Sequence, residues 1–126
     1  MNNINQNKYV FIIDNCIISA NRIFNALGNV ANIFKVGYAA NGKEALQKLI
    51  NNRPNAILLD IQLPDMKGTD ILQQIKQVYP DMTIIILTDY STNYSYTVCK
   101  KLGANGYYNK TNGLDMAIKQ LQKLTK

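Results

Sequence analysis

Short runs of apolar residues recur along the chain, and each run is followed by a stretch with helical spacing. The most apolar runs cover residues 9–13, 56–59 and 83–87. Continuous apolar runs of this length are typical of strands buried on both faces of a parallel sheet. Residues 33–39 are less apolar and predict a strand at a sheet edge, and residues 106–109 predict a short fifth strand.

Four helices are predicted from apolar residues at helical spacing. The positions expected to be buried are Ile17, Ala20, Phe24 and Leu27; Ala45, Leu46, Leu49 and Ile50; Ile71, Leu72, Ile75 and Val78; and Leu114, Ala117, Ile118, Leu121 and Leu124. Another helix is predicted over residues 92–102, ended by Gly103. Asn41 and Glu44 resemble a capping box, and Pro80 should end the helix before it.

This order of strand then helix, repeated five times, predicts an α/β fold with a parallel sheet and helices on both faces. Right-handed crossovers leave few topologies. We expect the flavodoxin-like (βα)5 three-layer sandwich with strand order 2-1-3-4-5. Residues 8–126 should form this one domain, and the polar residues 1–7 should form a disordered N-terminal arm.

Composition excludes several kinds of site. The chain has no histidine and two cysteines, Cys16 and Cys99, so zinc sites and Ser-His or Cys-His catalytic pairs are not expected. The net charge is +6, but the lysines form no run, and direct nucleic-acid binding is not expected. No apolar stretch approaches the ~20 residues of a membrane span, and no signal peptide is evident, so we expect a cytoplasmic protein.

Polar residues follow four of the predicted strands. They are Asp14, Asp60, Thr88 and Lys110. Ligands of such sheets bind outside the carboxyl ends of the strands, so these side chains should converge on one rim. Their joint occurrence there predicts a functional site.

Several motifs resemble one family. The segment LLDIQLPDMKG at residues 58–68 resembles the phosphoacceptor loop of response-regulator receiver domains in two-component signalling. Residues 12–14 resemble that family's first strand with its acidic pair, and residues 86–88 resemble its fourth strand with a hydroxyl. Residues 103–110 resemble the motif with a switch aromatic residue and a lysine. The resemblance covers about residues 9–124.

The resemblance implies a role for each site residue. Asp60 would accept a phosphoryl group from a histidine kinase or a histidine phosphotransfer protein, and Thr88 and Lys110 would bind the phosphoryl oxygens. Mg²⁺ would be held by Asp60, by Asp14 through water and by the backbone carbonyl of Gln62. The chain would be a stand-alone response regulator that assists its own phosphoryl transfer and hydrolysis without being an enzyme for another substrate.

The resemblance also implies a switch. Thr88 would move toward the phosphoryl group and allow Tyr107 to rotate, although the adjacent Tyr108 leaves the identity of the switch residue open. The fourth helix, fifth strand and fifth helix would then bind a downstream protein, and a homodimer through this face is a further expectation. The residues expected on this face include Tyr96, Lys100, Tyr108 and Lys119.

Three residues depart from the family pattern. Asn15 stands where the family usually has a second, metal-binding acid, so we expect weakened Mg²⁺ binding. Asp89 follows Thr88 where a small residue is usual; it could hinder access, point outward or replace the lost charge. Thr111 stands where a proline, often after a cis bond, follows Lys110.

The third departure makes a structural prediction. A cis bond before a residue other than proline costs about 3 kcal/mol, so the bond between Lys110 and Thr111 should be trans. Thr111 or Asn112 should then cap the last helix.

Other functions are left open. A pseudo-receiver would bind partners without phosphorylation, and Asn15 and Asp89 favour it. A flavodoxin-like cofactor enzyme would need a glycine-rich or hydroxyl-rich phosphate loop after the first strand, which is absent here. A nucleic-acid binder would need a basic stripe that the sequence does not show.

Overall fold

The computed structural model describes residues 8–124 of the chain. The expected N-terminal arm over residues 1–7 lies outside the described residues, as do residues 125–126. Among the described residues, no helix is both long and apolar enough to cross a bilayer.

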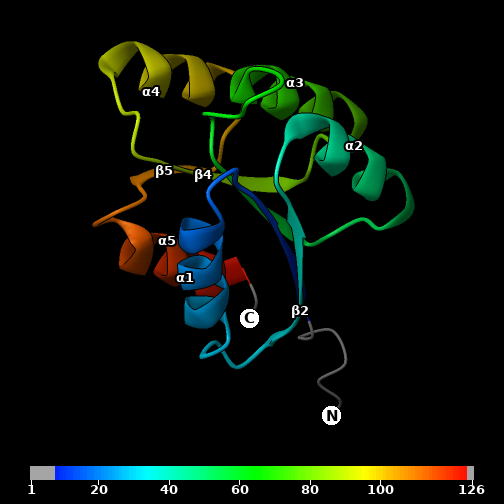
Figure 1. Cartoon of the computed structure of the whole chain (residues 1–126), viewed down its shortest axis with the longest axis vertical. Coiled ribbons are helices and arrows are strands. Elements are labelled where there is room, and N and C mark those ends of the chain that lie inside the picture. Colours follow the sequence, from blue (N-terminus) through cyan, green and yellow to red (C-terminus); the bar gives the residue numbers. More distant parts are fainter. Residues whose placement is uncertain (1–7, 125–126) are drawn as a thin grey trace.

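Five strands form one parallel sheet in the order β2-β1-β3-β4-β5, so the predicted topology is confirmed. The strands are β1 (Lys8–Ile13), β2 (Ile33–Ala39), β3 (Ala56–Leu59), β4 (Thr83–Thr88) and β5 (Gly106–Asn109). The helices are α1 (Ile17–Leu27), α2 (Gly42–Asn51), α3 (Gly68–Val78), α4 (Asn93–Lys101) and α5 (Leu114–Leu124). Figure 1 shows α1 and α5 on one side of the sheet and α2, α3 and α4 on the other.

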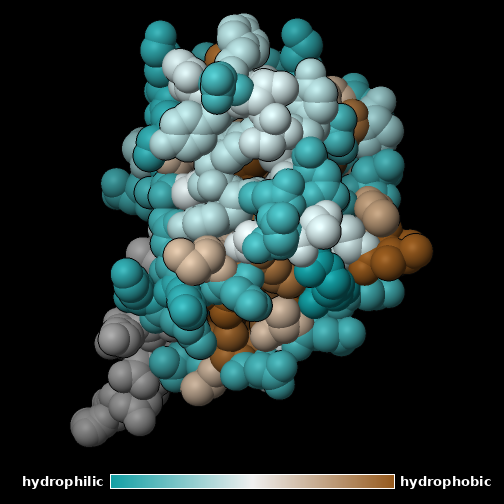
Figure 2. Space-filling view, turned by 90° about the vertical axis from the view of Figure 1, so that its left-hand side faces the viewer, coloured by the Kyte–Doolittle hydropathy of each residue, from teal (hydrophilic) through white to brown (hydrophobic). Residues whose placement is uncertain are grey.

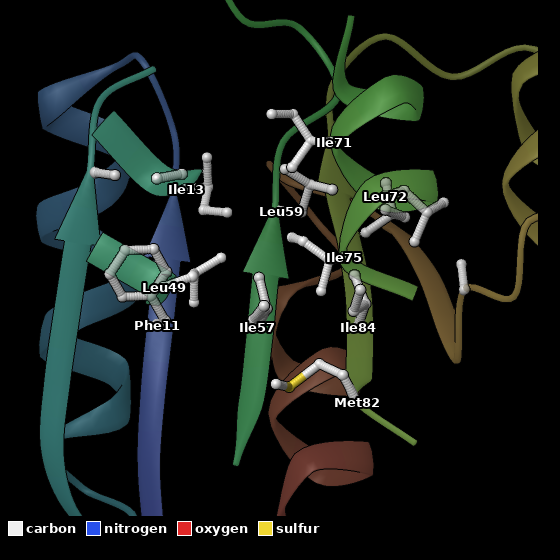
Figure 3. Close-up of a cluster of buried hydrophobic side chains, with 14 of the residues drawn as sticks. Phe11, Ile13, Leu49, Ile57, Leu59, Ile71, Leu72, Ile75, Met82 and Ile84 are labelled. Atoms are coloured by element: carbon white, nitrogen blue, oxygen red, sulfur yellow. The ribbon is translucent and has the colours of Figure 1, made fainter. Parts of the chain in front are cut away.

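The central strands are buried on both faces, which explains their uninterrupted apolar runs. Side chains alternate along a strand, so neighbours in the sequence enter different clusters. Phe11 and Ile13 face α2 and α3, whereas Val10 and Ile12 face α1 and α5. Figure 3 shows the first cluster, whose labelled members are Phe11, Ile13, Leu49, Ile57, Leu59, Ile71, Leu72, Ile75, Met82 and Ile84.

The expected buried face of α1 is wrong at two positions. Ile17 and Phe24 are 58% and 53% exposed. The buried residues are Ser19, Ala20, Ile23 and Leu27. Each residue advances a helix by about 100°. A predicted buried face that is offset by one position therefore includes side chains that point away from the core.

The ends of α2 and α3 also differ from expectation. Ile50 and Val78 are 76% and 68% exposed, although both follow the apolar spacing. Both line an open groove between the two helices, which leaves their side chains uncovered. Helical spacing identifies the face that turns inward but does not show where the covering layer stops.

The start of α2 is capped as the sequence predicts. The Asn41 side chain accepts a hydrogen bond from the Glu44 amide at 2.8 Å. The Glu44 carboxylate reaches back to the Ala40 amide at 3.0 Å, one residue earlier than a standard capping box requires.

Asp65 ties the loop after β3 to the same helix end. Its two carboxylate oxygens accept hydrogen bonds from the amides of Gly42 and Lys43, each at 2.9 Å. These bonds lower the pKa of Asp65 below the usual aspartate value, because they favour the charged form. The loop that carries residues 61–67 is therefore anchored to α2.

Truncation of isoleucine to alanine should lower the free energy of unfolding at a buried position much more than at an exposed one. Ile75 is 3% exposed on α3, and Ile50, 76% exposed on α2, is a matched control. Ile75→Ala should lower the free energy of unfolding by about 2–5 kcal/mol through lost burial and a residual cavity. Ile50→Ala should change it by less than about 0.5 kcal/mol. Equilibrium urea unfolding measures both, and equal losses would contradict the packing described.

The hydrogen bonds from the amides of Gly42 and Lys43 to the Asp65 carboxylate should make the stability of the fold depend on pH. The folded pKa of Asp65 is depressed, so its carboxylate stabilises the fold above the unfolded pKa, and this contribution disappears as pH falls through the folded pKa. Asp65→Asn should therefore be less stable than wild type near neutral pH, and the two should converge well below the ordinary aspartate pKa of about 3.9.

Urea unfolding at a series of pH values measures this difference. Asp70→Asn, which removes an exposed acid from the first turn of α3, is the control. A difference between wild type and Asp65→Asn that persists unchanged into acid would contradict the role given to the Asp65 charge.

Candidate functional site

Lys110 lies at the centre of a buried cluster with two aspartates. Its Nζ lies 2.5 Å from Asp60 Oδ2, and 3.3 and 3.2 Å from the two carboxylate oxygens of Asp14. The exposed fractions of Asp14, Asp60 and Lys110 are only 1%, 6% and 7%. Asp14 and Asp60, which lie 96 and 50 residues before Lys110 in the sequence, therefore meet it in one buried cluster.

The register of the sheet explains this meeting. Ile13 of β1 pairs with Leu59 of β3, so Asp14 and Asp60, the residues that follow, leave the sheet side by side. Lys110 follows β5, which is separated from β3 by β4. The long lysine side chain spans that distance.

The charge of Lys110 is set by opposing effects. Burial alone would lower the pKa of Lys110, because a low dielectric disfavours an ammonium. The hydrogen bond and charge of Asp60, with those of Asp14, outweigh burial and raise the pKa above the usual lysine value. The site therefore holds a protonated ammonium against two acidic side chains.

Asp14 is oriented by donors from the start of α1. Its Oδ1 accepts a hydrogen bond from the Cys16 amide, and its Oδ2 accepts one from the Ser19 hydroxyl, both at 2.8 Å. The Tyr38 hydroxyl donates to the Asp14 backbone carbonyl at 2.8 Å. Ser19 was not predicted from sequence; its only signal is a hydroxyl in the first turn of the helix that follows the acid.

The loop after Asp60 is closed on itself. The Gln62 amide donates to Asp60 Oδ1 at 3.0 Å, and the Gly68 amide donates to the Ile61 carbonyl at 3.0 Å. A Cβ on Gly68 would lie 2.2 Å from the Ile61 Cα, so only glycine fits there. This close approach holds the loop, and with it the Asp60 carboxylate, against the start of α3.

Thr88 ends β4, the strand between those of Asp60 and Lys110. The Thr88 side chain is fully buried, and its Oγ1 accepts a hydrogen bond from the Tyr90 amide at 3.1 Å. The Thr88 carbonyl accepts one from the Lys110 amide at 3.1 Å. The structure thus brings Thr88 to the same rim.

Tyr107 and Tyr108 point to opposite faces of β5, as neighbours in a strand must. The Tyr107 hydroxyl donates to Ser95 Oγ at 3.0 Å, and its ring packs edge-on against Tyr96 with centroids 5.4 Å apart. The Tyr108 hydroxyl donates to Gln120 Oε1 at 2.5 Å. Tyr107 is therefore the tyrosine that contacts α4, whereas Tyr108 contacts α5.

The two carboxylates of this site suit a small divalent cation. Among residues 8–123, no cluster holds three or more His, Cys, Asp or Glu side chains arranged for a metal. Mg²⁺ in proteins is usually held by one or two carboxylates and several waters, and Asp14 and Asp60 meet that requirement. Asn15, which follows Asp14 in the sequence, is exposed.

The residues around Lys110 settle two structural expectations. No described peptide bond is cis, so the predicted trans bond between Lys110 and Thr111 is confirmed. The expected cap of α5 is wrong, because the helix begins at Leu114, after Gly113. Thr111 instead uses its hydroxyl to donate to Asp89 Oδ1 at 2.8 Å.

Asn112 is likewise outside the helix cap. Its amide donates to the Asn109 side chain at 3.0 Å, within the turn that precedes α5. Arg22, on α1, donates to the Lys110 carbonyl, and no feature of the sequence singled it out.

Comparisons with known proteins agree with this geometry. The sequence pattern of the response regulator receiver domain matches residues 10–122. Sporulation initiation phosphotransferase F of Bacillus subtilis is 31% identical over 112 residues, which cover 86% of each chain. The uncharacterized transcriptional regulatory protein YhcZ of Bacillus subtilis is 33% identical over 87 residues, or 69% of this chain, and the match spans only 41% of that relative's length.

A solved structure shows the same architecture. The CheY-like response regulator receiver domain protein of Methanospirillum hungatei superimposes with a TM-score of 0.83 at 30% identity, covering 94% of both chains. Together with the match over residues 10–122, this shows that the chain belongs to the response regulator receiver domain family of two-component systems.

Proposed function

We propose that this chain is a phosphorylation-dependent switch whose phosphoacceptor is Asp60. The observation that supports this most strongly is the buried cluster of Asp14, Asp60 and Lys110, with Asp60 only 2.5 Å from the lysine ammonium. An ammonium in that position neutralises charge on an incoming phosphoryl group. No other group of side chains in the described part of the chain combines acids and a cation at this depth.

The proposed reaction is phosphoryl transfer from a phosphohistidine. A carboxylate oxygen of Asp60 forms a bond to phosphorus while the nitrogen–phosphorus bond of the donor breaks. The electron pair of that bond goes to the imidazole nitrogen, which takes up a proton. Lys110 transfers its contact from Asp60 to a phosphoryl oxygen, so its charge stays paired throughout.

Receiver domains generally bind Mg²⁺. In this chain Asp60, Asp14 and the backbone carbonyl of Gln62 would hold the ion, with Asn15 as a neutral neighbour. The bound ion would neutralise charge on the phosphoryl oxygens. Two acids instead of three weaken the expected affinity, because Mg²⁺ prefers anionic oxygen ligands.

The proposed switch runs from Thr88 to Tyr107. The Thr88 hydroxyl would donate to a phosphoryl oxygen and draw the loop after β4 toward Asp60. That loop includes Tyr90, whose carbonyl lies 3.4 Å from the Tyr107 hydroxyl. A shift of the loop therefore disturbs the contacts that hold Tyr107 against Ser95, and the arrangement of α4 changes with it.

The proposed partner surface is the face formed by α4, β5 and α5. Tyr96 is 46% exposed, and Lys100 and Lys119 are exposed, while Tyr108 is half-buried. In Figure 2, the visible face is mostly hydrophilic or of intermediate hydropathy, with hydrophobic residues in the lower part and at one edge. A downstream protein, or a second copy of this chain, would dock there.

Receiver domains interact with histidine kinases or phosphotransfer proteins, and we propose such a donor for Asp60. The relative from Bacillus subtilis that matches over most of its length is itself called a phosphotransferase. This supports a second use of the same site, in which Asp60 passes its phosphoryl group on to another protein.

A pseudo-receiver that binds partners without phosphorylation is the alternative. The observation that favours it is Asn15, since the described residues offer no third acid to a metal. Phosphorylation of the purified protein separates the two functions.

The central prediction concerns covalent modification of Asp60. Incubation with acetyl phosphate and Mg²⁺ should add the mass of one phosphoryl group to the intact protein. Asp60→Ala should abolish the gain, because the nucleophile is removed, whereas Asp70→Ala, which removes an exposed acid nearby in sequence, should retain it. Intact-protein mass spectrometry provides the measurement.

No mass gain at any Mg²⁺ concentration would exclude the switch and favour the pseudo-receiver. A gain that survives in Asp60→Ala would place the phosphoryl group on another residue.

Restoring the missing acid should strengthen metal binding. Asn15→Asp should raise the Mg²⁺ affinity roughly tenfold or more, because a carboxylate adds a direct Coulomb attraction. Asn25→Asp is the matched control. It adds the same charge near the end of α1, about 15 Å from position 15 along the helix direction, which is beyond the Debye length of about 10 Å. Isothermal titration calorimetry should show unchanged affinity for the control, and equal affinities for Asn15→Asp and wild type would refute the assignment.

A further inference from the structure

Two residues that depart from the family pattern bond to each other. Asp89 Oδ1 accepts a hydrogen bond from the Thr111 hydroxyl at 2.8 Å and another from the Thr111 amide at 3.0 Å. A proline at position 111 could provide neither donor, since it has no amide hydrogen and no hydroxyl. We call this pair of hydrogen bonds the 89–111 link.

The link joins the two loops that border the site. Asp89 directly follows Thr88 at the end of β4, and Thr111 directly follows Lys110 after β5. The strands themselves also meet here, because the Lys110 amide donates to the Thr88 carbonyl at 3.1 Å. The link extends the pairing of β4 and β5 beyond the end of the sheet.

The backbone amide and carbonyl of Lys110 and the amide of Thr111 are all hydrogen-bonded. The Lys110 amide bonds to Thr88, and its carbonyl accepts a hydrogen bond from Arg22. The following amide, that of Thr111, donates to both Asp89 and the Asn109 side chain, at 3.0 and 2.9 Å. The peptide unit after Lys110 is therefore fixed on both sides.

Fixing this peptide matters because a lysine side chain has four rotatable carbon bonds and about 2 kcal/mol of rotamer entropy. The Lys110 ammonium must reach Asp60 and Asp14 across β4. Because this side chain is long, a small rotation of the backbone at Lys110 displaces the ammonium by more than it displaces the Cα. The link removes that freedom at the point where the side chain begins.

The link also determines where the Asp89 charge lies. Asp89 is exposed, and within residues 8–123 its carboxylate accepts hydrogen bonds from Thr111, whereas the Lys110 ammonium bonds to Asp14 and Asp60. The carboxylate is thereby kept from competing for Lys110.

We propose that Asp89 is a positioning residue for Lys110, which acts through Thr111 to hold the ammonium in place for phosphoryl transfer. This inference rests on the proposed phosphorylation of Asp60. It assigns to Asp89 a supporting role rather than the hindrance that an acid beside the site would otherwise imply.

Two variants of Asp89 separate the effect of the 89–111 link from the effect of the Asp89 charge. Asp89→Asn removes the charge but keeps an acceptor oxygen, whereas Asp89→Ala removes both. Acetyl phosphate and Mg²⁺ are the probe, and the rate of phosphorylation is followed by intact mass. Asp89→Ala should react about 2- to 10-fold more slowly than Asp89→Asn, the range expected for loss of a hydrogen bond.

Two further variants locate the effect at Thr111. Thr111→Val keeps the amide but loses the hydroxyl, and its effect should not add to that of Asp89→Ala in the double variant, because both break the same link. Asp81→Ala removes an exposed acid just before β4, at the opposite end from Asp89, and should leave the rate unchanged.

A second readout does not depend on phosphorylation. In ¹H–¹⁵N NMR spectra of the unmodified protein, the Thr111 amide and the Lys110 ammonium signals should shift in Asp89→Ala and stay close to wild type in Asp89→Asn. The free energy of unfolding should change little in either variant, since Asp89 is exposed.

The outcomes are distinct. If wild type is phosphorylated but Asp89→Ala and Asp89→Asn react equally fast, the positioning role is wrong and the proposed function stands. If wild type is not phosphorylated at all, the proposed function fails and the positioning role falls with it. Unchanged Lys110 signals in Asp89→Ala would also overturn the inference, whatever the rates.

Discussion

The paired charges of Lys110, Asp14 and Asp60 are the interaction on which the site depends. Burying an ammonium or a carboxylate alone is very unfavourable, so each of these groups is tolerated only because the others are present. Removing one partner of such a buried pair typically destabilises a protein by about 3–5 kcal/mol, mainly because a charge is left unpaired. If Asp60 is phosphorylated as proposed, the phosphoryl group would give the lysine a new anionic partner, so the ammonium would remain paired.

The parallel sheet makes this arrangement possible. All five strands end at the same edge, and the pairing of Ile13 with Leu59 places the two acids next to each other. The helices then supply the supports: Ser19 and Arg22 from α1 hold Asp14 and the Lys110 carbonyl, and the start of α2 holds Asp65. The site is thus built from loops whose positions are set by rigid elements on both faces.

The sequence predicted the strand order and the residues at the rim because both follow from short-range patterns. Apolar runs define the strands, and the residue after each run must lie at the sheet edge. The direction of Asp89 could not be predicted, because it depends on Thr111, 22 residues away. The exposure of Ile50 and Val78 was missed for a similar reason, since the spacing of apolar residues does not show how far the opposing layer extends.

The departures from the family pattern are better understood together than separately. Asn15 weakens the negative charge offered to a metal, whereas Asp89 adds an acid that the structure bonds to Thr111 instead of to the site. Asp89 is therefore a poor substitute for the missing metal ligand as long as Thr111 holds it. Under the proposed function, such a site would rely more on Lys110 than a site with three acids and a tightly bound ion, and the exact placement of the Lys110 backbone would then matter for phosphoryl transfer.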